Sequence, residues 1–136
     1  MNALEAALYA RLTGGTALTT LLSGTTSVYN QMVPTTETGD CVVFGLTGGG
    51  DENLCPQRSQ ALLYSVKGVS EVSAAKAGTI DAQVDALLHR ATLTVTGWAN
   101  ILLRRESEFS FTEKTPEGRH YYHRGGVYRI HLWQNT

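Results

Sequence analysis

SEVSAAKAGTIDAQVDALLHR, residues 70–90, is the stretch that decides the fold, because it holds the one long run of helical periodicity in the chain. Its apolar side chains recur every three or four residues and form one stripe, which is the pattern of an amphipathic helix. Ser70 or Ser73 is suited to cap the start of this helix. The residues of the stripe are Ala77, Ile80, Val84, Leu87 and Leu88. We therefore expect the helix to lie across a sheet and to form much of the core.

Patterns typical of β-strands flank this helix on both sides. Residues 58–69 alternate, which places Leu62, Tyr64 and Val66 on one face of a strand. Further strand segments are expected at residues 93–98, 101–105, 108–112 and 127–133. The first two of these are either separate strands or one long strand bent near Gly97. A proline-containing turn is expected at residues 115–118.

The N-terminal part adds helices and two shorter strands. Leu4, Leu8 and Leu12 have helical spacing within residues 2–13, and the Gly14 and Gly15 pair ends that helix. A short helix at 17–22, a brief strand at 28–30 and a buried strand at 40–46 follow. This order of elements predicts a single α+β domain, residues 1–136, with a mostly antiparallel sheet and helices packed on one face.

The stretch TGGGDENLCPQ, residues 47–57, is predicted to be a long flexible loop. Loops of this length inside a compact domain are commonly functional or disordered. Ordering such a loop costs conformational entropy, which contacts with a neighbouring molecule can offset. We therefore expect it to be an assembly element, in which Gly48, Gly49, Gly50, Asp51 and Glu52 touch an adjacent subunit or layer.

Composition is that of a folded protein, with 42% hydrophobic and 17% charged residues. No apolar run is long enough to cross a membrane, and the N-terminus lacks the pattern of a signal peptide. The net charge of −1 hides an asymmetry: residues 1–88 carry 4 basic and 8 acidic side chains, whereas residues 89–136 carry 7 and 4. Opposite charges of this kind can orient association between copies or with a partner.

The motifs of common catalytic and binding sites are missing. Gly48, Gly49 and Gly50 are followed directly by Asp51 and Glu52, whose charges would repel a phosphate group. The spacing of the cysteines and histidines does not match a zinc site, and no GxSxG motif is present. Asp81 and Asp85 share a helix face but are expected to be solvated. We expect no catalytic, cofactor or metal residues, and free thiols at Cys41 and Cys55 rather than a disulfide.

Arginines and tyrosines are concentrated near the C-terminus, a pattern that nucleic-acid-binding proteins also show. Glu106 and Glu108 dilute this positive charge, so contact with protein is the favoured interpretation. Neighbouring residues of a strand point to opposite faces, so Arg104 and Arg105 cannot serve one surface together. Arg104, Arg105, Arg124 and Arg129 are the candidate interface arginines. Their expected partners are carboxylates of the next subunit: Asp51, Glu52, Asp81 or Asp85.

Several segments in their order resemble the small tail terminator or tail completion proteins of long-tailed bacteriophages. The segments are NALEAALYARL, VYNQMVP, CVVFG, LLYSVKGV, VDALLHR, LTVTGW, LLRRESEF and GRHYYHRGGVYRI. The resemblance covers nearly the whole chain and is carried by the order and spacing of the segments, because no single motif is diagnostic.

The resemblance implies a structural virion protein, made in the host cytoplasm, that forms a homo-oligomeric ring, commonly hexameric. Such a ring caps the tail tube at its head-proximal end and joins it to the head connector, so its partners are the tube protein and the connector. DNA only passes through the lumen, and no membrane, cofactor or catalytic residue is implied. Head–tail joining and tube proteins share the fold, so the layer stays open. A small nucleic-acid-binding domain or enzyme that uses the C-terminal arginines and histidines is the alternative of another class.

Overall fold

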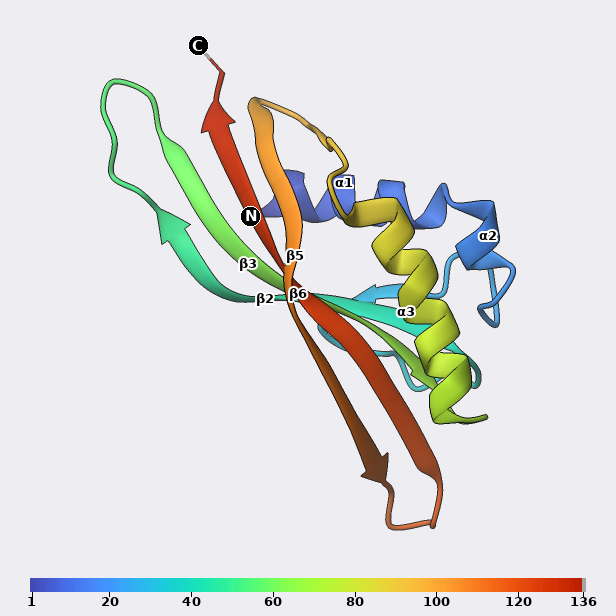
Figure 1. Ribbon diagram of the computed structural model, residues 1–136. Helices are drawn as coiled ribbons and strands as arrows, with labels where there is room; N and C mark the ends of the chain where they lie inside the picture. Colours follow the sequence, from blue (N-terminus) through green and yellow to red (C-terminus); the bar gives the residue numbers. More distant parts are fainter. Residues whose placement is uncertain (136) are drawn as a thin grey trace.

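The computed structural model describes residues 1–135, a strongly curled sheet with helices on one of its faces (Figure 1). Within these residues the strand order is β1-β2-β3-β6-β5-β4. β1 and β2 are parallel, and the other neighbouring strands are antiparallel. The elements are α1 (Asn2–Thr13), α2 (Thr16–Thr19), β1 (Val28–Asn30), β2 (Cys41–Asp51), β3 (Ser59–Ser70), α3 (Ala74–Leu88), β4 (Thr94–Val95), β5 (Trp98–Lys114) and β6 (His120–Gln134). The expected α+β fold with a mostly antiparallel sheet is confirmed.

α3 is the helix expected from the central periodicity. The Ser73 hydroxyl caps it by accepting a hydrogen bond from the Lys76 N–H at 3.0 Å. Four of the five predicted stripe residues are buried: Ala77, Ile80, Val84 and Leu88. Leu87 is only partly buried at the edge of the core. The helix begins at Ala74, later than the quoted stretch, because the residues before it end β3 and form the cap.

The main core lies between the helices and one face of the sheet. Leu4, Leu8 and Leu12 of α1 are fully buried there. The sheet contributes alternate residues of its strands, namely Val42, Phe44, Leu62, Tyr64, Val66, Tyr128, Ile130 and Leu132. Burying each large apolar side chain stabilises the fold by about 1.5–3 kcal/mol. The opposite face of the sheet carries none of the described helices and has a smaller cluster of Cys41, Val43 and Val69.

Of the two alternatives expected near Gly97, the structure has separate strands, β4 and β5. This glycine has a φ of +83° and forms the tight turn between β4 and β5, so it does not bend one long strand. Residues 101–112, expected as two segments, belong to the single strand β5. β5 then turns at Gly118 into β6, as the TPEG sequence predicts. The result is a long β5–β6 hairpin that extends past the helices in Figure 1.

Candidate functional site

The outer edge of β2 is open over residues 45–51, because β1 pairs only as far as Phe44. The inner edge of β2 pairs with β3 up to Asp51, which lies opposite Gln60. The prediction of a flexible loop at residues 47–57 is therefore wrong for residues 47–51, which form strand. The sequence misled because glycine has little strand preference of its own, whereas the β3 backbone offers this segment its hydrogen bonds.

The outer edge of β5 is divided into a covered part and an open part. β4 pairs with Trp98 and Ala99. The chain after α3 then covers the next residues, since the Arg90 N–H donates to the Leu103 carbonyl at 2.9 Å and the Arg105 N–H to His89 Nδ1 at 3.1 Å. Residues 107–114 pair with β6 on one side. On the other side they have no strand neighbour within the described chain.

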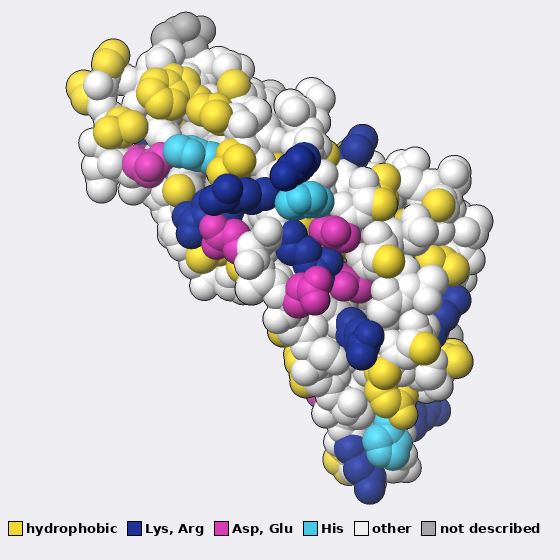
Figure 2. Space-filling model, in the orientation of Figure 1, with side chains coloured by type: hydrophobic (Ala, Val, Ile, Leu, Met, Phe, Trp, Pro, Cys, Tyr) yellow, Lys and Arg dark blue, Asp and Glu magenta, His cyan; other side chains and the backbone are white. Residues whose placement is uncertain are grey.

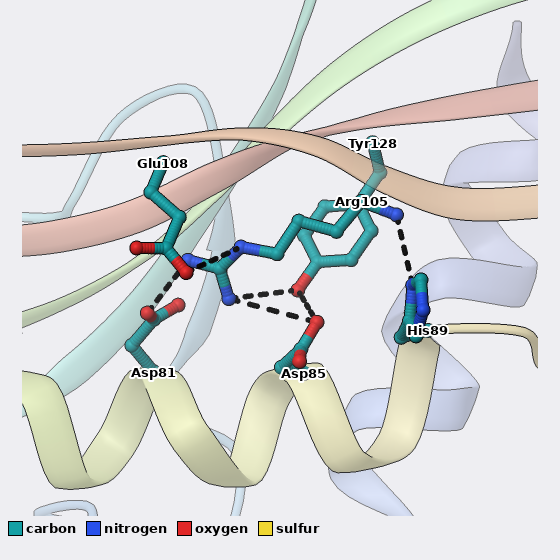
Figure 3. Close-up of polar contacts among 6 residues, drawn as sticks. All are labelled: Asp81, Asp85, His89, Arg105, Glu108 and Tyr128. Carbon is teal, nitrogen blue, oxygen red and sulfur yellow. Dashed lines mark hydrogen bonds and ion pairs between the residues drawn. The ribbon is translucent and has the colours of Figure 1, made fainter.

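Arg105, one of the candidate interface residues, is bound within its own subunit. Its side chain is 10% exposed and lies between β5 and α3, where Nη2 contacts Asp81 Oδ2 at 2.7 Å (Figure 3). Nη1 lies 3.6 Å from Asp85 Oδ1, which also accepts a hydrogen bond from the Tyr128 hydroxyl at 3.0 Å. Asp81 is thus bound within the subunit and only 16% exposed, so the expectation that it is solvated is wrong, whereas Asp85 is also bound but its side chain is still 37% exposed.

Opposing influences act on the ionisation of this cluster. Burial by itself lowers the pKa of the Arg105 guanidinium, but the hydrogen bond to Asp81 and the nearby charges outweigh it and raise the pKa. Burial raises the pKa of the Tyr128 hydroxyl. Arg105 therefore stays charged at every pH at which the chain is folded. Since the charge is paired, the cluster fixes α3 to the middle of the sheet.

The other candidate arginines lie on different faces. Arg129 is on the helix-free face and pairs with Glu106 of the same chain, with Nη2 3.2 Å from Oε2. Arg104 is exposed on that face, and Arg124 is exposed beside Gly78 of α3. Neither Arg104 nor Arg124 forms a salt bridge with a carboxylate in the part of the chain described. The structure does not gather the candidate arginines into one patch.

The tip formed by β2 and β3 holds a small polar network. Asp51 pairs with Arg58 at 2.7 Å, and Glu52 contacts both Ser59 and His131. A serine, a histidine and a carboxylate thus meet, but Glu52 and the Ser59 hydroxyl contact the same ring nitrogen, Nε2. A catalytic triad needs the carboxylate on Nδ1, and Ser59 is fully buried. The network therefore has a structural role in holding the tip.

A cavity of about 420 Å³ lies on the helix-free face, between the segment before β2 and the strands β2, β3 and β6. Cys41 lines its floor, and burial raises the pKa of this thiol to about 12, so it stays protonated and unreactive. His123 is buried here, at 7% exposed. Its Nε2 contacts Glu113 at 3.1 Å, and its ring stacks on Phe111. Burial lowers the pKa of His123, and nearby Lys67 lowers it further.

The visible surface separates two ends of the molecule (Figure 2). Apolar side chains gather at the end where β2 meets β3, where Leu54 and Trp133 are exposed. Charged side chains of both signs are interspersed across the middle. Cys41 and Cys55 are both free thiols, as expected. Among residues 1–135 no helix is long and apolar enough to cross a membrane, and no group of three or more potential ligands could hold a metal ion.

Two aromatic residues on the open part of β5 were not among the predicted site residues. Phe109 and Phe111 stack with ring centroids 6.2 Å apart, and Phe111 is 48% exposed. Their alternation with polar residues predicted the strand but not its open edge. The signal available in the sequence was a pair of aromatics in the segment 107–114, whose other residues are all polar.

Comparisons with known proteins identify the family and the fold. A family model described as tail completion protein gp17 matches residues 6–130. No curated protein matches the chain. The structure is similar to a chain in the solved virion of a native gene transfer agent particle, with a TM-score of 0.78 and 21% sequence identity. That alignment covers 97% of this chain and 96% of the other, so the two share the fold over their whole length.

Proposed function

Since this chain belongs to the tail completion protein gp17 family and is therefore a structural protein of the phage virion tail, we propose that it assembles into a hexameric ring at the head-proximal end of the tail tube. In this proposal the ring ends the tube and joins it to the head connector. The role is structural and not catalytic.

The observation that carries the ring is the pair of open strand edges. Open edges with unpaired N–H and C=O groups bind other strands readily, and natural proteins cover them or pair them. This subunit has two such edges on opposite sides of one sheet, on β2 and on β5. Contact between two unlike surfaces is head-to-tail, and it closes into a ring when the rotation between neighbours divides the circle evenly.

The two ends of the subunit support contacts with two different layers. The β2–β3 tip exposes Leu54 and Trp133 beside the acidic Asp51 and Glu52, whereas the β5–β6 turn carries Lys114 and Arg119 beside Glu117. A ring whose subunits lie side by side would present one kind of end on each rim. A head–tail joining protein or a tube protein of the same fold would share these features and is the alternative layer.

The alternative of a nucleic-acid-binding domain or an enzyme has less support. Arg105 is paired beneath α3 and Arg129 is paired with Glu106. Two of the arginines that suggested a nucleic-acid footprint are therefore already neutralised within the subunit.

Electron microscopy of phage particles tests the proposed position and copy number. We expect six copies of the chain in one layer between the tail tube and the head connector. Tails made without the chain should be unjoined to heads and irregular in length. Copies repeated along the whole tube would instead identify a tube protein, and a layer without this chain at the joint would contradict the proposal.

A further inference from the structure

Of three consecutive glycines in β2, the fold of one subunit requires Gly49 but does not explain Gly48 or Gly50. Gly49 is required, because its φ is +87° and a Cβ there would lie 2.1 Å from the Ala61 carbonyl oxygen. A Cβ added at Gly50 would meet no atom within 4 Å, and at Gly48 the nearest would be a Leu63 methyl at 4.0 Å. Neither has a positive φ. Glycine weakens a strand, so free space at both positions needs another cause.

An aromatic row on the same face supplies that cause. Gly48 and Gly50 lie opposite Leu63 and Ala61 of β3. Through β6, Phe109 and Phe111 align with Lys67 and Val69 of β3. All four β3 residues are an even number of positions apart, so the glycines and the phenylalanines are on one face of the sheet, the helix-free face. Aromatic rings that reach across a strand edge fit over glycines of the adjoining strand.

The direction of the strands fits a junction between β5 and β2. β2, β3, β6 and β5 alternate in direction, so β5 runs opposite to β2. A second copy placed alongside by rotation therefore brings its β2 antiparallel to β5 and continues the alternation. The covered parts do not interfere, since β1 covers β2 only up to Phe44 and the chain after α3 covers β5 only up to Arg105.

We propose that residues 107–114 of β5 pair antiparallel with residues 45–51 of β2 in a second copy of the chain, with Phe109 lying over Gly50 and Phe111 over Gly48. This junction rests on the proposed ring and specifies its interface. The register also carries the acidic tip with Asp51 and Glu52 toward the neighbour's Arg104. That arginine has no salt bridge within residues 1–135, so it can add to the contacts that Asp51 and Glu52 already make with Arg58 and His131.

Valine at position 50 is the steric test. Nothing in the subunit contacts a side chain there, and valine favours strands, so Gly50→Val should keep or raise the melting temperature of the free chain. In particles it should abolish joined tails, because valine occupies the space of the neighbour's ring. Ser110→Val, on the other face of β5, is the matched control and should leave joining intact. Normal joining by Gly50→Val would overturn the proposed register.

Disulfide trapping in assembled particles tests the junction directly. In a Cys55→Ser background, Phe109→Cys combined with Gly48→Cys or Gly50→Cys should give a ladder of linked chains on non-reducing gels after mild oxidation. Glu108→Cys with Gly50→Cys is the control, because position 108 is on the opposite face.

The outcomes separate this inference from the proposed function. A ladder from either 109 pair and none from the 108 pair supports the junction. A ring seen by microscopy without a ladder overturns the junction and leaves the ring standing. Dimers from Phe109→Cys alone would show β5 pairing with β5 and also overturn it. Particles without a ring of this chain would contradict the proposed function itself.

Discussion

β5 contains two regions of opposite character in one continuous strand. Residues 98–105 are covered by β4 and by the chain after α3, and they include buried Leu103 and the paired Arg105. Residues 107–114 are hydrogen-bonded on one side and exposed except for Phe109, which is half-buried. The boundary is the bulge at Glu106, where the register shifts. One strand thus stabilises the fold at one end and offers an open edge for assembly at the other.

The largest effect is expected where α3 covers the sheet. Leu88 is fully buried, so Leu88→Ala should lower the free energy of unfolding by about 2–5 kcal/mol. Leu87→Ala, at the partly buried neighbouring position, is the control and should cost clearly less. Chemical denaturation of the two variants measures the difference. Equal stability of Leu88→Ala and the parent would show that α3 is placed wrongly.

A second change tests the covered half of β5 through its charge. Arg105→Met leaves Asp81 without its partner at a nearly buried site and should cost about 3 kcal/mol. Arg104→Met, one position earlier and exposed without a salt bridge in the described chain, should leave stability almost unchanged. A further Asp81→Asn change should restore part of the loss in Arg105→Met. If urea denaturation showed the same loss of stability for Arg105→Met and Arg104→Met, the claim that only the Arg105 side of β5 is paired with α3 would be contradicted.

The sequence predicted those features of the fold that depend on local periodicity. α1, α3 and the buried faces of β3 and β6 follow from the spacing of apolar residues such as Leu62, Tyr64 and Ile130. The strand at Gly48 could not be predicted, because its stability comes from β3 and not from its own residues. The pairing of Arg105 with Asp81 depends on which face of β5 meets α3, and no local pattern contains that information.

The helix-free face should show a pH dependence from His123. Burial and Lys67 lower its pKa below the usual 6.5, against the opposing effect of Glu113. The unfolded chain therefore binds the proton more readily, and the stability is present above pH 6.5 and is lost as the pH falls below it. The slope is at most about 1.4 kcal/mol per pH unit. Stability curves between pH 7.5 and 5 should be flatter in His123→Gln than in the exposed control His120→Gln.

Carboxylates with lowered pKa values, such as Glu37 and Glu106, act in a more acidic window, below their ordinary value of 4.5. Their protonation therefore does not obscure the effect of His123 on stability between pH 7.5 and 5. Identical slopes in His123→Gln and the parent over this range would contradict the buried, neutral imidazole.

The smallest effect on the isolated chain is expected at Arg129. Its salt bridge with Glu106 is at the surface, where such pairs add little to stability. Arg129→Glu should therefore change the melting temperature less than Leu88→Ala or Arg105→Met. Glu106→Arg, and not a change in an acidic residue of another subunit, should reverse any loss. Rescue of tail joining only by a change at Asp51 or Glu52 would restore Arg129 as an interface residue.

Amide hydrogen exchange of β5 in the free chain and in assembled particles tests the contrast between the two regions most directly. Residues 98–105 should be protected in both states, because the subunit itself covers them. Residues 107–114 should exchange quickly in the free chain at amides on the outer edge and become protected in particles, together with residues 45–51 of β2. Unchanged exchange of both segments on assembly would contradict the account that these open edges build the ring.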